Sequence, residues 1–241
     1  PAEVDSVENL YLAGLHLEQY RHPFVSPLPY WEEALRRDPG DLRTHIALGR
    51  QAFRCGELEK AEKHFRSAIA RLTSLNYNPY DCEAYYYLGL TLNNLERNDE
   101  AYDALGKAAW DYAWQSAALY RMALIDVKRG DFVTALTHIE QSSQTNTRNL
   151  KARNLTSAIL RHLGQLDEAE NLAWDTLKID PLDYWAHNEL VLTAKESGKP
   201  RVAQQRLDEM HRLLHGDTQI YLDVVLDYAS AGLWEDTCTL L

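Results

Sequence analysis

The sequence repeats itself every 34 residues, and this period limits the folds open to the chain more than any other feature. A small residue four positions before an apolar one recurs at Ala61, Ala101, Ala135, Ala169 and Ala203. The intervals are 40, 34, 34 and 34 residues. Turn glycines recur with the same period and the same insertion at Gly56, Gly130, Gly164, Gly198 and Gly232. Two series that agree in this way indicate an array of repeated structural units.

Each unit has the pattern of two helices joined by a polar turn. In the third unit an apolar segment at 84–92 precedes the polar run 96–99, and then Ala101, Leu105 and Ala108 recur at helical spacing. Small residues are favoured where two helices cross closely, because a larger side chain would push the axes apart. Gly56 suits a turn, because glycine takes a positive φ without steric cost. The period therefore predicts an all-α chain.

A proline two residues before an aspartate marks the junctions between units. The prolines are Pro39, Pro79 and Pro181, at intervals of 40 and 102 residues, and the second interval is three periods. Proline cannot continue the preceding helix, and the aspartate can cap the next helix by accepting a free backbone N–H. This third series agrees with the other two.

A 34-residue helix–turn–helix unit of this kind resembles the tetratricopeptide repeat. The residues that carry the resemblance are Leu48-Gly49 and Leu88-Gly89 in first helices and Ala61, Phe65 and Ala68 in a second helix. The resemblance covers nearly the whole chain. It implies an all-α, right-handed superhelical α-solenoid of about seven helix pairs in a single domain, 1–241. The expected repeats are 8–40, 41–81, 82–115, 116–149, 150–183, 184–217 and an incomplete 218–241.

Three irregularities interrupt the pattern. In the later repeats the first-helix glycine is replaced, by Ala123, Ser157, Val191 and Val225. The first repeat has a loop at 21–29 with three prolines, and the second repeat is followed by six extra residues in the region 71–78. The extra residues are expected to extend the second helix or its loop. Each irregular segment is either a candidate interaction site or a plain insertion.

A narrower resemblance rests on the runs 14–23, 30–39, 83–90 and 180–183. Together they resemble the helical portion of large bacterial proteins in which a β-rich, carbohydrate-enzyme-like domain of unknown function precedes the repeats. This implies a bacterial cytoplasmic protein connected with sugar metabolism, and it carries over no catalytic residue. Because the chain opens on Pro1 and stops on the apolar run 238–241, we expect a fragment of a longer protein. Further helix should follow, or this end should pack on a neighbour.

Composition narrows the classes of partner. Thirty-six acidic residues against 25 basic ones give a formal charge of −11, which argues against non-specific binding to nucleic acid. The three cysteines are odd in number and widely spaced, which favours a reducing compartment over a disulfide framework. No apolar run approaches the roughly 18 residues that a membrane span needs. We therefore expect a cytoplasmic protein with neither nucleic acid nor a membrane as partner.

No set of residues indicates catalysis, a metal or a cofactor. His211 and His215 lie four apart on one helix face, which suits metal binding, but no third ligand is evident. The acidic pairs at 99–100, 167–168 and 235–236 recur at one phase of the repeat, where they complement the helix dipole. A feature that recurs at one phase of the repeat is architectural. The segment is therefore predicted not to be an enzyme.

The resemblance places a partner on the concave side, which the first helix of each repeat lines. Residues there that are outside the packing set gather basic, amide and aromatic side chains. Asparagine can bond both N–H and C=O of an extended peptide, and arginine can hold a carboxylate through two hydrogen bonds. We therefore predict a groove for an acidic or carboxylate-bearing segment. The candidate residues are Arg50, Tyr86, Tyr87, Asn93, Asn94, Tyr120, Arg121, Lys128, Lys151, Asn154 and Arg161.

Three functions remain open from the sequence. The chain is predicted first to be a protein-interaction scaffold that holds a peptide, its own upstream domain or a second copy of itself. The alternatives are an accessory module of a carbohydrate-active enzyme and an oligomerisation module. The lysine and asparagine set with which some tetratricopeptide proteins bind chaperone C-termini is absent, since Ile46, Arg50 and Tyr87 stand at its positions.

Overall fold

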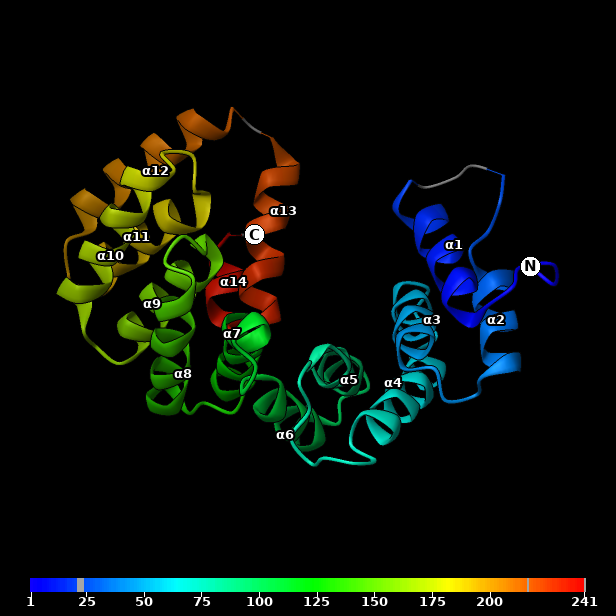
Figure 1. Cartoon of the computed structure of the whole chain (residues 1–241). Helices are drawn as coiled ribbons and strands as arrows, with labels where there is room; N and C mark the ends of the chain where they lie inside the picture. Colours follow the sequence, from blue (N-terminus) through cyan, green and yellow to red (C-terminus); the bar gives the residue numbers. More distant parts are fainter. Residues whose placement is uncertain (21–23, 216, 241) are drawn as a thin grey trace. The chain divides into compact units, whose positions relative to one another are not determined.

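The structure, a computed structural model, describes residues 1–20, 24–215 and 217–240, and every regular element in these ranges is an α-helix (Figure 1). The all-α prediction is confirmed. The chain divides into two compact units, Pro1–Trp114 and Gln115–Leu241. A single solenoid over residues 1–241 stays a prediction, and each unit is described by itself.

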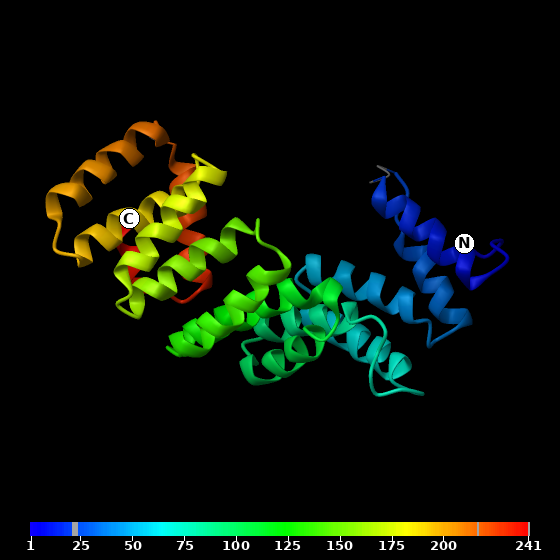
Figure 2. The ribbon, with the colours of Figure 1, turned by 60° about the vertical axis from the view of Figure 1, so that its left-hand side comes forward.

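The helices pack in consecutive pairs within each unit (Figures 1 and 2). The first unit contains α1 (Val7–Gln19), α2 (Leu28–Arg37), α3 (Leu42–Arg54), α4 (Leu58–Leu72), α5 (Glu83–Asn94) and α6 (Asn98–Ala108). Helix α7 (Tyr112–Lys128) begins at the end of that unit. The second unit continues with α8 (Phe132–Thr145), α9 (Leu150–His162), α10 (Leu166–Ile179), α11 (Tyr184–Glu196), α12 (Pro200–Leu214), α13 (Thr218–Ser230) and α14 (Trp234–Leu240).

Two of the three junction aspartates, Asp41 and Asp183, cap first helices as the sequence predicts, whereas the residue at the N-cap of α5 is Cys82 and makes no side-chain cap bond. The Asp41 carboxylate accepts the backbone N–H of Thr44 at 2.9 Å, ahead of α3. Asp183 accepts the N–H of Ala186 at the same distance, ahead of α11. Each bond satisfies one of the free donors that the first turn of a helix leaves. The prolines before them therefore mark true helix boundaries.

Glycine sits in first helices because second-helix side chains press directly on the backbone there. A Cβ on Gly49 would lie 2.6 Å from the Phe65 ring, and a Cβ on Gly89 would lie 2.6 Å from Leu105. Phe65 and Leu105 are fully buried by this approach. The close crossing of α3 with α4 and of α5 with α6 thus requires a residue without a side chain.

The six extra residues lie in a loop. Helix α4 ends at Leu72 and α5 begins at Glu83, so the irregular segment is the connection between them. In the first repeat, α2 begins at Leu28, and Pro27 stands immediately before it. The rest of that proline-rich loop includes residues 21–23, which lie outside the described residues.

The last helix pair of the second unit turns inward onto earlier helices. Val224 and Tyr228 of α13 share a buried core with Ala123 and Val127 of α7 and with Leu155 of α9. These helices are two and three pairs earlier in the chain. The pair α13–α14 therefore covers the faces of α7, α9 and α11 that a regular stack would leave open. Leu240 packs against the same core, and Leu241 lies outside the described residues.

Candidate functional site

The predicted groove residues divide between the two units. Arg50 on α3 and Tyr86, Tyr87, Asn93 and Asn94 on α5 belong to the first unit. The others, Tyr120, Arg121, Lys128, Lys151, Asn154 and Arg161, belong to the second. All lie on first helices, which gives two candidate faces. We call them the first inner face (α1, α3, α5 and Trp114) and the second inner face (α7, α9 and α11).

Half-buried aromatic rings form the centre of the first inner face. The Tyr87 ring stacks on Phe65 with 5.8 Å between centroids and meets Phe53 edge-on at 6.5 Å. The Tyr86 ring stacks on Trp114 at 5.0 Å. Each of these pairs is oriented as aromatic quadrupoles prefer. The rings of α3, α5 and Trp114 thus form one contiguous apolar surface that keeps part of its area in solvent.

Arg50 and Glu83 place a charged pair beside these rings. The Arg50 guanidinium lies 3.2 Å from a Glu83 carboxylate oxygen and 5.5 Å from the Tyr87 ring centroid. Burial raises the pKa of Glu83, against the opposing effect of Arg50. Burial also raises the pKa of the Tyr87 hydroxyl. The pair is therefore held in a partly dehydrated setting in which a carboxylate is costly to keep ionised.

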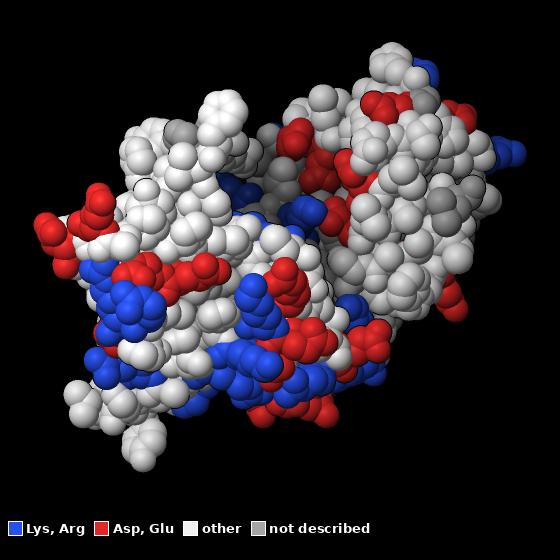
Figure 3. Space-filling model, turned by 90° about the vertical axis from the view of Figure 1, so that its right-hand side faces the viewer, with Lys and Arg blue, Asp and Glu red and all other residues white. Residues whose placement is uncertain are grey.

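Neighbouring arginines of α3 are paired across to α1. Arg43 binds Glu8 and lies 4.6 Å from the Tyr11 ring centroid. Arg54 binds Glu18. The cations of α3 therefore each contact a carboxylate of an adjacent first helix, so the face is mixed in charge. Figure 3 shows one side of the molecule, on which acidic and basic side chains lie intermingled.

The two asparagines of α5 differ in their setting. The Asn93 side-chain amide donates to the side-chain oxygen of Asn98 at 2.8 Å, which ties the end of α5 to the start of α6. Asn94 is exposed. Asn93 thus supports the turn, and Asn94 is the amide that the first unit presents to solvent.

In the second unit, Arg161 is enclosed by carboxylates. Its guanidinium contacts Glu189 at 3.0 Å, Glu196 at 2.7 Å and Asp236 at 2.7 Å, and only 2% of its side chain is exposed. Burial opposes the charged form, but the carboxylates of Glu189 and Asp236 raise the pKa of Arg161. Asp236 also accepts from His162 at 2.9 Å. The cation predicted to bind a partner is used inside the unit.

Helix α13 is held on the second inner face by further contacts. The Lys151 ammonium lies 2.6 Å from Asp227. The Asn188 amide donates to the Tyr228 hydroxyl at 2.9 Å, and that hydroxyl donates to Glu189 at 2.5 Å. Tyr228 is fully buried, and its ring lies 5.2 Å from that of Trp185. Lys128 packs against the turn after α13, where it would touch a side chain at Gly232.

The remaining predicted residues of the second unit act in packing. Asn154 is buried and donates to both carboxylate oxygens of Asp183, at 2.8 and 2.9 Å. Tyr120 packs against the core of the unit. The guanidinium of Arg121, which is partly exposed, lies 5.9 Å from the Tyr120 ring centroid. The second inner face therefore already has an occupant, and that occupant is the chain's own α13–α14.

The 34-residue period could not indicate this inward turn, because α13 and α14 have the same helical pattern as every earlier pair. One signal was present in the composition. Residues 218–240 contain Asp223, Asp227, Glu235 and Asp236 and no lysine or arginine. This acidic pair meets three basic residues of first helices, Lys128, Lys151 and Arg161.

The candidate catalytic groups take structural positions. Asp167 and Glu168 lie in the first turn of α10, and Glu235 and Asp236 in the first turn of α14, where acids complement the helix dipole. Among the described residues, no group of three or more His, Cys, Asp or Glu side chains is placed to hold a metal ion. In the same ranges, no helix is long and apolar enough to cross a membrane.

Comparison with known proteins agrees with this geometry. A tetratricopeptide repeat family matches residues 42–67. The fold is similar to that of PilF from Pseudomonas aeruginosa (19% identity, TM-score 0.71, over 90% of this chain and 95% of that one). It is also similar to a tetratricopeptide repeat protein from Parabacteroides merdae (16% identity, TM-score 0.67, over 98% and 97%). A third similar structure is YrrB, a TPR protein with an unusual peptide-binding site (21% identity, TM-score 0.63, over 80% and 96%).

These similarities establish the fold and leave the partner open. The matched repeat spans α3 and the first part of α4, where Gly49 meets Phe65. The tetratricopeptide repeat is a non-catalytic scaffold, which agrees with the prediction that this segment is not itself an enzyme. The chain has the helical-repeat fold of tetratricopeptide proteins.

Proposed function

We propose that this chain is a protein-interaction scaffold and that the first inner face is its binding surface. One observation carries the proposal: the partly exposed rings of Tyr86, Tyr87 and Trp114 lie together beside the Arg50–Glu83 pair. Aromatic residues and arginine are the side chains that most often anchor protein interfaces. No described segment of the first unit is packed over them as α13 is packed over the second inner face.

The ligand that suits this surface is a peptide segment, or an element of a neighbouring domain, with one carboxylate and an apolar or aromatic neighbour. Burial raises the pKa of Glu83, so its ionised form is poorly stabilised where it stands. A ligand carboxylate could displace Glu83, which makes a single hydrogen bond to Arg50 at 3.2 Å, and bind the guanidinium through two parallel hydrogen bonds. The rings of Tyr86 and Trp114 would then cover the neighbouring side chain. We keep the acidic partner predicted from the sequence as part of this proposal.

A peptide display selection on the intact chain tests the proposal. Selected peptides should bind Arg50→Glu and Tyr86→Ala variants at least about tenfold more weakly, the loss expected when an anchoring contact worth about 1.4 kcal/mol is removed. Arg121→Glu is the matched comparison, because it reverses a partly exposed cation on the second inner face. Binding that is lost in Arg121→Glu and kept in the other two variants would move the site to the second unit.

Two narrower roles stay as predictions: an accessory module of a carbohydrate-active enzyme, and oligomerisation. Light scattering over a range of concentrations tests the second, since a monomer throughout would exclude it. The reading frame around residue 1 tests the first, which requires an enzyme domain upstream. A cytoplasmic location likewise remains a prediction, and fractionation of the native cell would test it.

A further inference from the structure

The second inner face shows which kind of ligand it takes, because α13–α14 is seated on it. Tyr228 of α13 lies fully buried in the apolar core to which α7, α9 and α11 contribute. Asp227 pairs with Lys151 at 2.6 Å, and Asp236 of α14 pairs with Arg161 at 2.7 Å. The face therefore selects a helix pair that carries a buried tyrosine and two acids in this arrangement.

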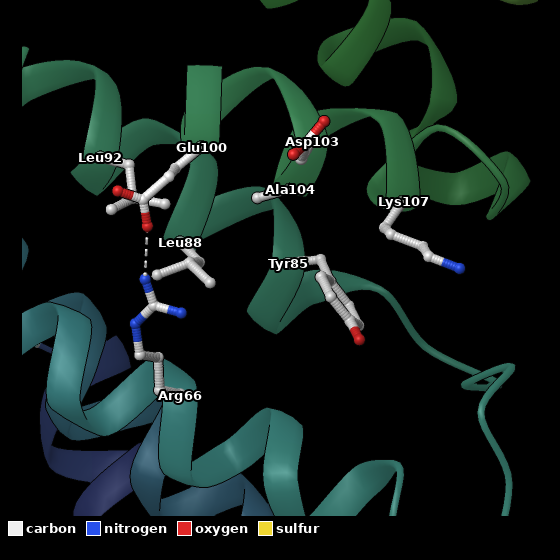
Figure 4. Close-up of a pocket in the computed structure, with 8 residues that line it drawn as sticks. All are labelled: Arg66, Tyr85, Leu88, Leu92, Glu100, Asp103, Ala104 and Lys107. Carbon is white, nitrogen blue, oxygen red and sulfur yellow. Dashed lines mark hydrogen bonds and ion pairs between the residues drawn. The ribbon is translucent and has the colours of Figure 1, made fainter. Parts of the chain in front are cut away.

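A hollow of the first unit shows no such selection. It lies between α4 and the pair α5–α6 and has a volume of about 270 Å³ (Figure 4). Arg66 lies 3.1 Å from Glu100 there, and Asp103 and Lys107 add one further charge of each sign. The charges are balanced within the hollow, so charge alone selects no ligand.

The connection that brings α13 onto the second inner face is short and contains a strained residue. Residues 215–217 join the end of α12 at Leu214 to the start of α13 at Thr218, and residue 216 lies outside the described residues. His215 has a φ of +49°, in the left-handed region, which its Cβ disfavours. Among the described residues, Glu96 is the only other non-glycine residue with a positive φ. Short hinges under strain favour the exchange of the element that follows them between two copies of a protein.

Helix α13 depends on helices distant in the sequence more than on its predecessor. Helices α12 and α13 diverge from their connection (Figure 1), and beside it the His211 and Tyr221 rings lie 6.2 Å apart. The core contacts and ion pairs of α13–α14 are made with α7, α9 and α11. A second copy of the chain offers the same three helices, so α13–α14 can make these contacts in either copy.

We propose that two copies of this chain exchange α13–α14 reciprocally, so that each pair seats on the second inner face of the other copy. The exchanged dimer keeps the Lys151–Asp227 and Arg161–Asp236 pairs, now between copies. It also allows both His215 residues to leave the left-handed region. A second copy fits better than an unrelated helix, because it carries Tyr228 and both acids in the required positions.

The closed monomer competes with this dimer. A connection of this length holds α13–α14 near its own face at an effective concentration in roughly the millimolar range. Exchange should therefore become visible as the concentration of the chain approaches that range. No residue of the first unit takes part, so this proposal and the one for the first inner face stand or fall separately.

Light scattering on the intact chain, after incubation at about 10 μM to about 1 mM, tests the proposal. The dimer fraction should rise with concentration and decay slowly on dilution, because α13–α14 has to detach before it can return. His215→Val places a β-branched residue at the positive φ and should raise the dimerisation constant, whereas His215→Gly should lower it. Each change should be at least about tenfold, since every dimer contains two hinges.

Glu96→Val is the matched control for the hinge variants. Glu96 has a φ of +61° and lies in the first unit, so the substitution adds the same kind of strain away from the hinge. It should leave the dimerisation constant unchanged. Because His215 is exposed, both hinge variants should fold, and circular dichroism checks this.

Mixing two charge-reversed variants shows which surfaces meet in the dimer. Lys151→Glu and Asp227→Lys each place like charges at this contact, both in the closed chain and in a dimer of identical copies. A dimer of one copy of each variant has opposite charges at both contacts, and no closed chain does. Differently tagged variants should therefore be captured together about fivefold more than either variant with itself. Arg43→Glu mixed with Glu8→Arg, a pair within the first unit, should give no such enrichment.

Three results would overturn the proposal. The first is a monomer at all concentrations up to about 1 mM. The second is a dimer whose amount is the same in His215→Val, His215→Gly and the unaltered chain. The third is equal capture in the mixture and in each charge-reversed variant alone, which would show a dimer formed through another surface.

Discussion

At the scale of single residues, Glu96 occupies a position that five other turns between paired helices give to glycine. Its φ is +61°, close to the +76° of Gly56 forty residues earlier, and it is exposed. A side chain in the left-handed region costs roughly 1–2 kcal/mol, partly offset by the greater freedom of glycine in the unfolded chain. We therefore expect Glu96→Gly to raise the free energy of unfolding by about 0.5–1 kcal/mol in urea titrations. Glu140→Gly, at an exposed position within α8, should lower it.

Gly49 should be intolerant of even one added carbon. A Cβ there meets the Phe65 ring at 2.6 Å, so Gly49→Ala forces α3 and α4 apart and should cost about 1–3 kcal/mol. Gly106 in α6 is the matched control, because a Cβ at that position meets nothing within 4 Å. Gly106→Ala should stabilise the protein by roughly 0.5–1 kcal/mol, through helix propensity. Equal effects of the two substitutions in thermal melts would refute the close-crossing argument.

The His45–His64 contact makes stability depend on pH in a narrow window. The two Nδ1 atoms lie 3.0 Å apart, and His45 Nε2 lies 2.9 Å from the Pro39 carbonyl, to which it donates. Burial lowers the pKa of His64 to about 4, with His45 and Lys60 acting in the same direction. Between pH 4 and the ordinary value near 6.5 the unfolded chain therefore binds more protons at this position, so stability falls as the pH is lowered through that range.

We expect His64→Gln to remove this part of the pH dependence. Since water reaches part of the imidazole, the difference from the unaltered chain should reach roughly 1–2 kcal/mol between pH 7 and pH 4. Urea titrations at several pH values measure it. His211→Gln, at an exposed position on α12, should keep the pH profile of the unaltered chain.

At the scale of helices, the sequence predicts what is local and repeated. Asp41 and Asp183 cap the helices that follow them, and Gly49 and Gly89 stand where helices cross, because each depends on neighbours within a few dozen residues. The position of α13 does not follow from such patterns. Lys151 and Asp227 are 76 residues apart, and no period relates them, so their contact exists only once the chain between them has folded. The 34-residue period led to the residues of the first inner face. It gave no sign that α13–α14 would pack over the second inner face.

Arg161 should be the most sensitive polar residue of the second unit. Arg161→Met would leave the fully buried Glu189 facing Asp236 and the Tyr228 hydroxyl without a cation. Breaking a buried ion pair from one side typically costs 3–5 kcal/mol, and we expect a loss of about that size in denaturant titrations. Lys151→Met removes an exposed pair to Asp227 and should cost less than about 1 kcal/mol. Similar losses for both variants would contradict the enclosed network.

At the scale of the whole molecule, a destabilising substitution in one of the two compact units should leave the stability of the other unit unchanged. Tyr228→Ala would leave a cavity between α11 and α13, and removal of a buried aromatic side chain typically costs 3–5 kcal/mol. Because helical arrays are stabilised mainly by contacts between neighbouring units, hydrogen exchange should accelerate in α9, α11, α13 and α14. Exchange in α3 to α6 should stay as it is, and mass spectrometry of peptic peptides resolves the two regions. Acceleration throughout the chain would show a single cooperative unit.

The inward turn of α13–α14 also bears on how such a sequence can change its length. Helical arrays grow and shrink by duplication or loss of whole repeats. In the first unit each helix packs mainly on its neighbours in sequence. An extra copy of α3–α4 would therefore pack against the same kinds of neighbouring helix as the original pair. In the second unit, Arg161 reaches Asp236 across 75 residues, and one duplicated repeat between them would carry α14 away from α9. Among related sequences, the number of repeats should therefore vary in the region that corresponds to residues 1–114. Between α9 and α14, selection should keep the number of repeats constant.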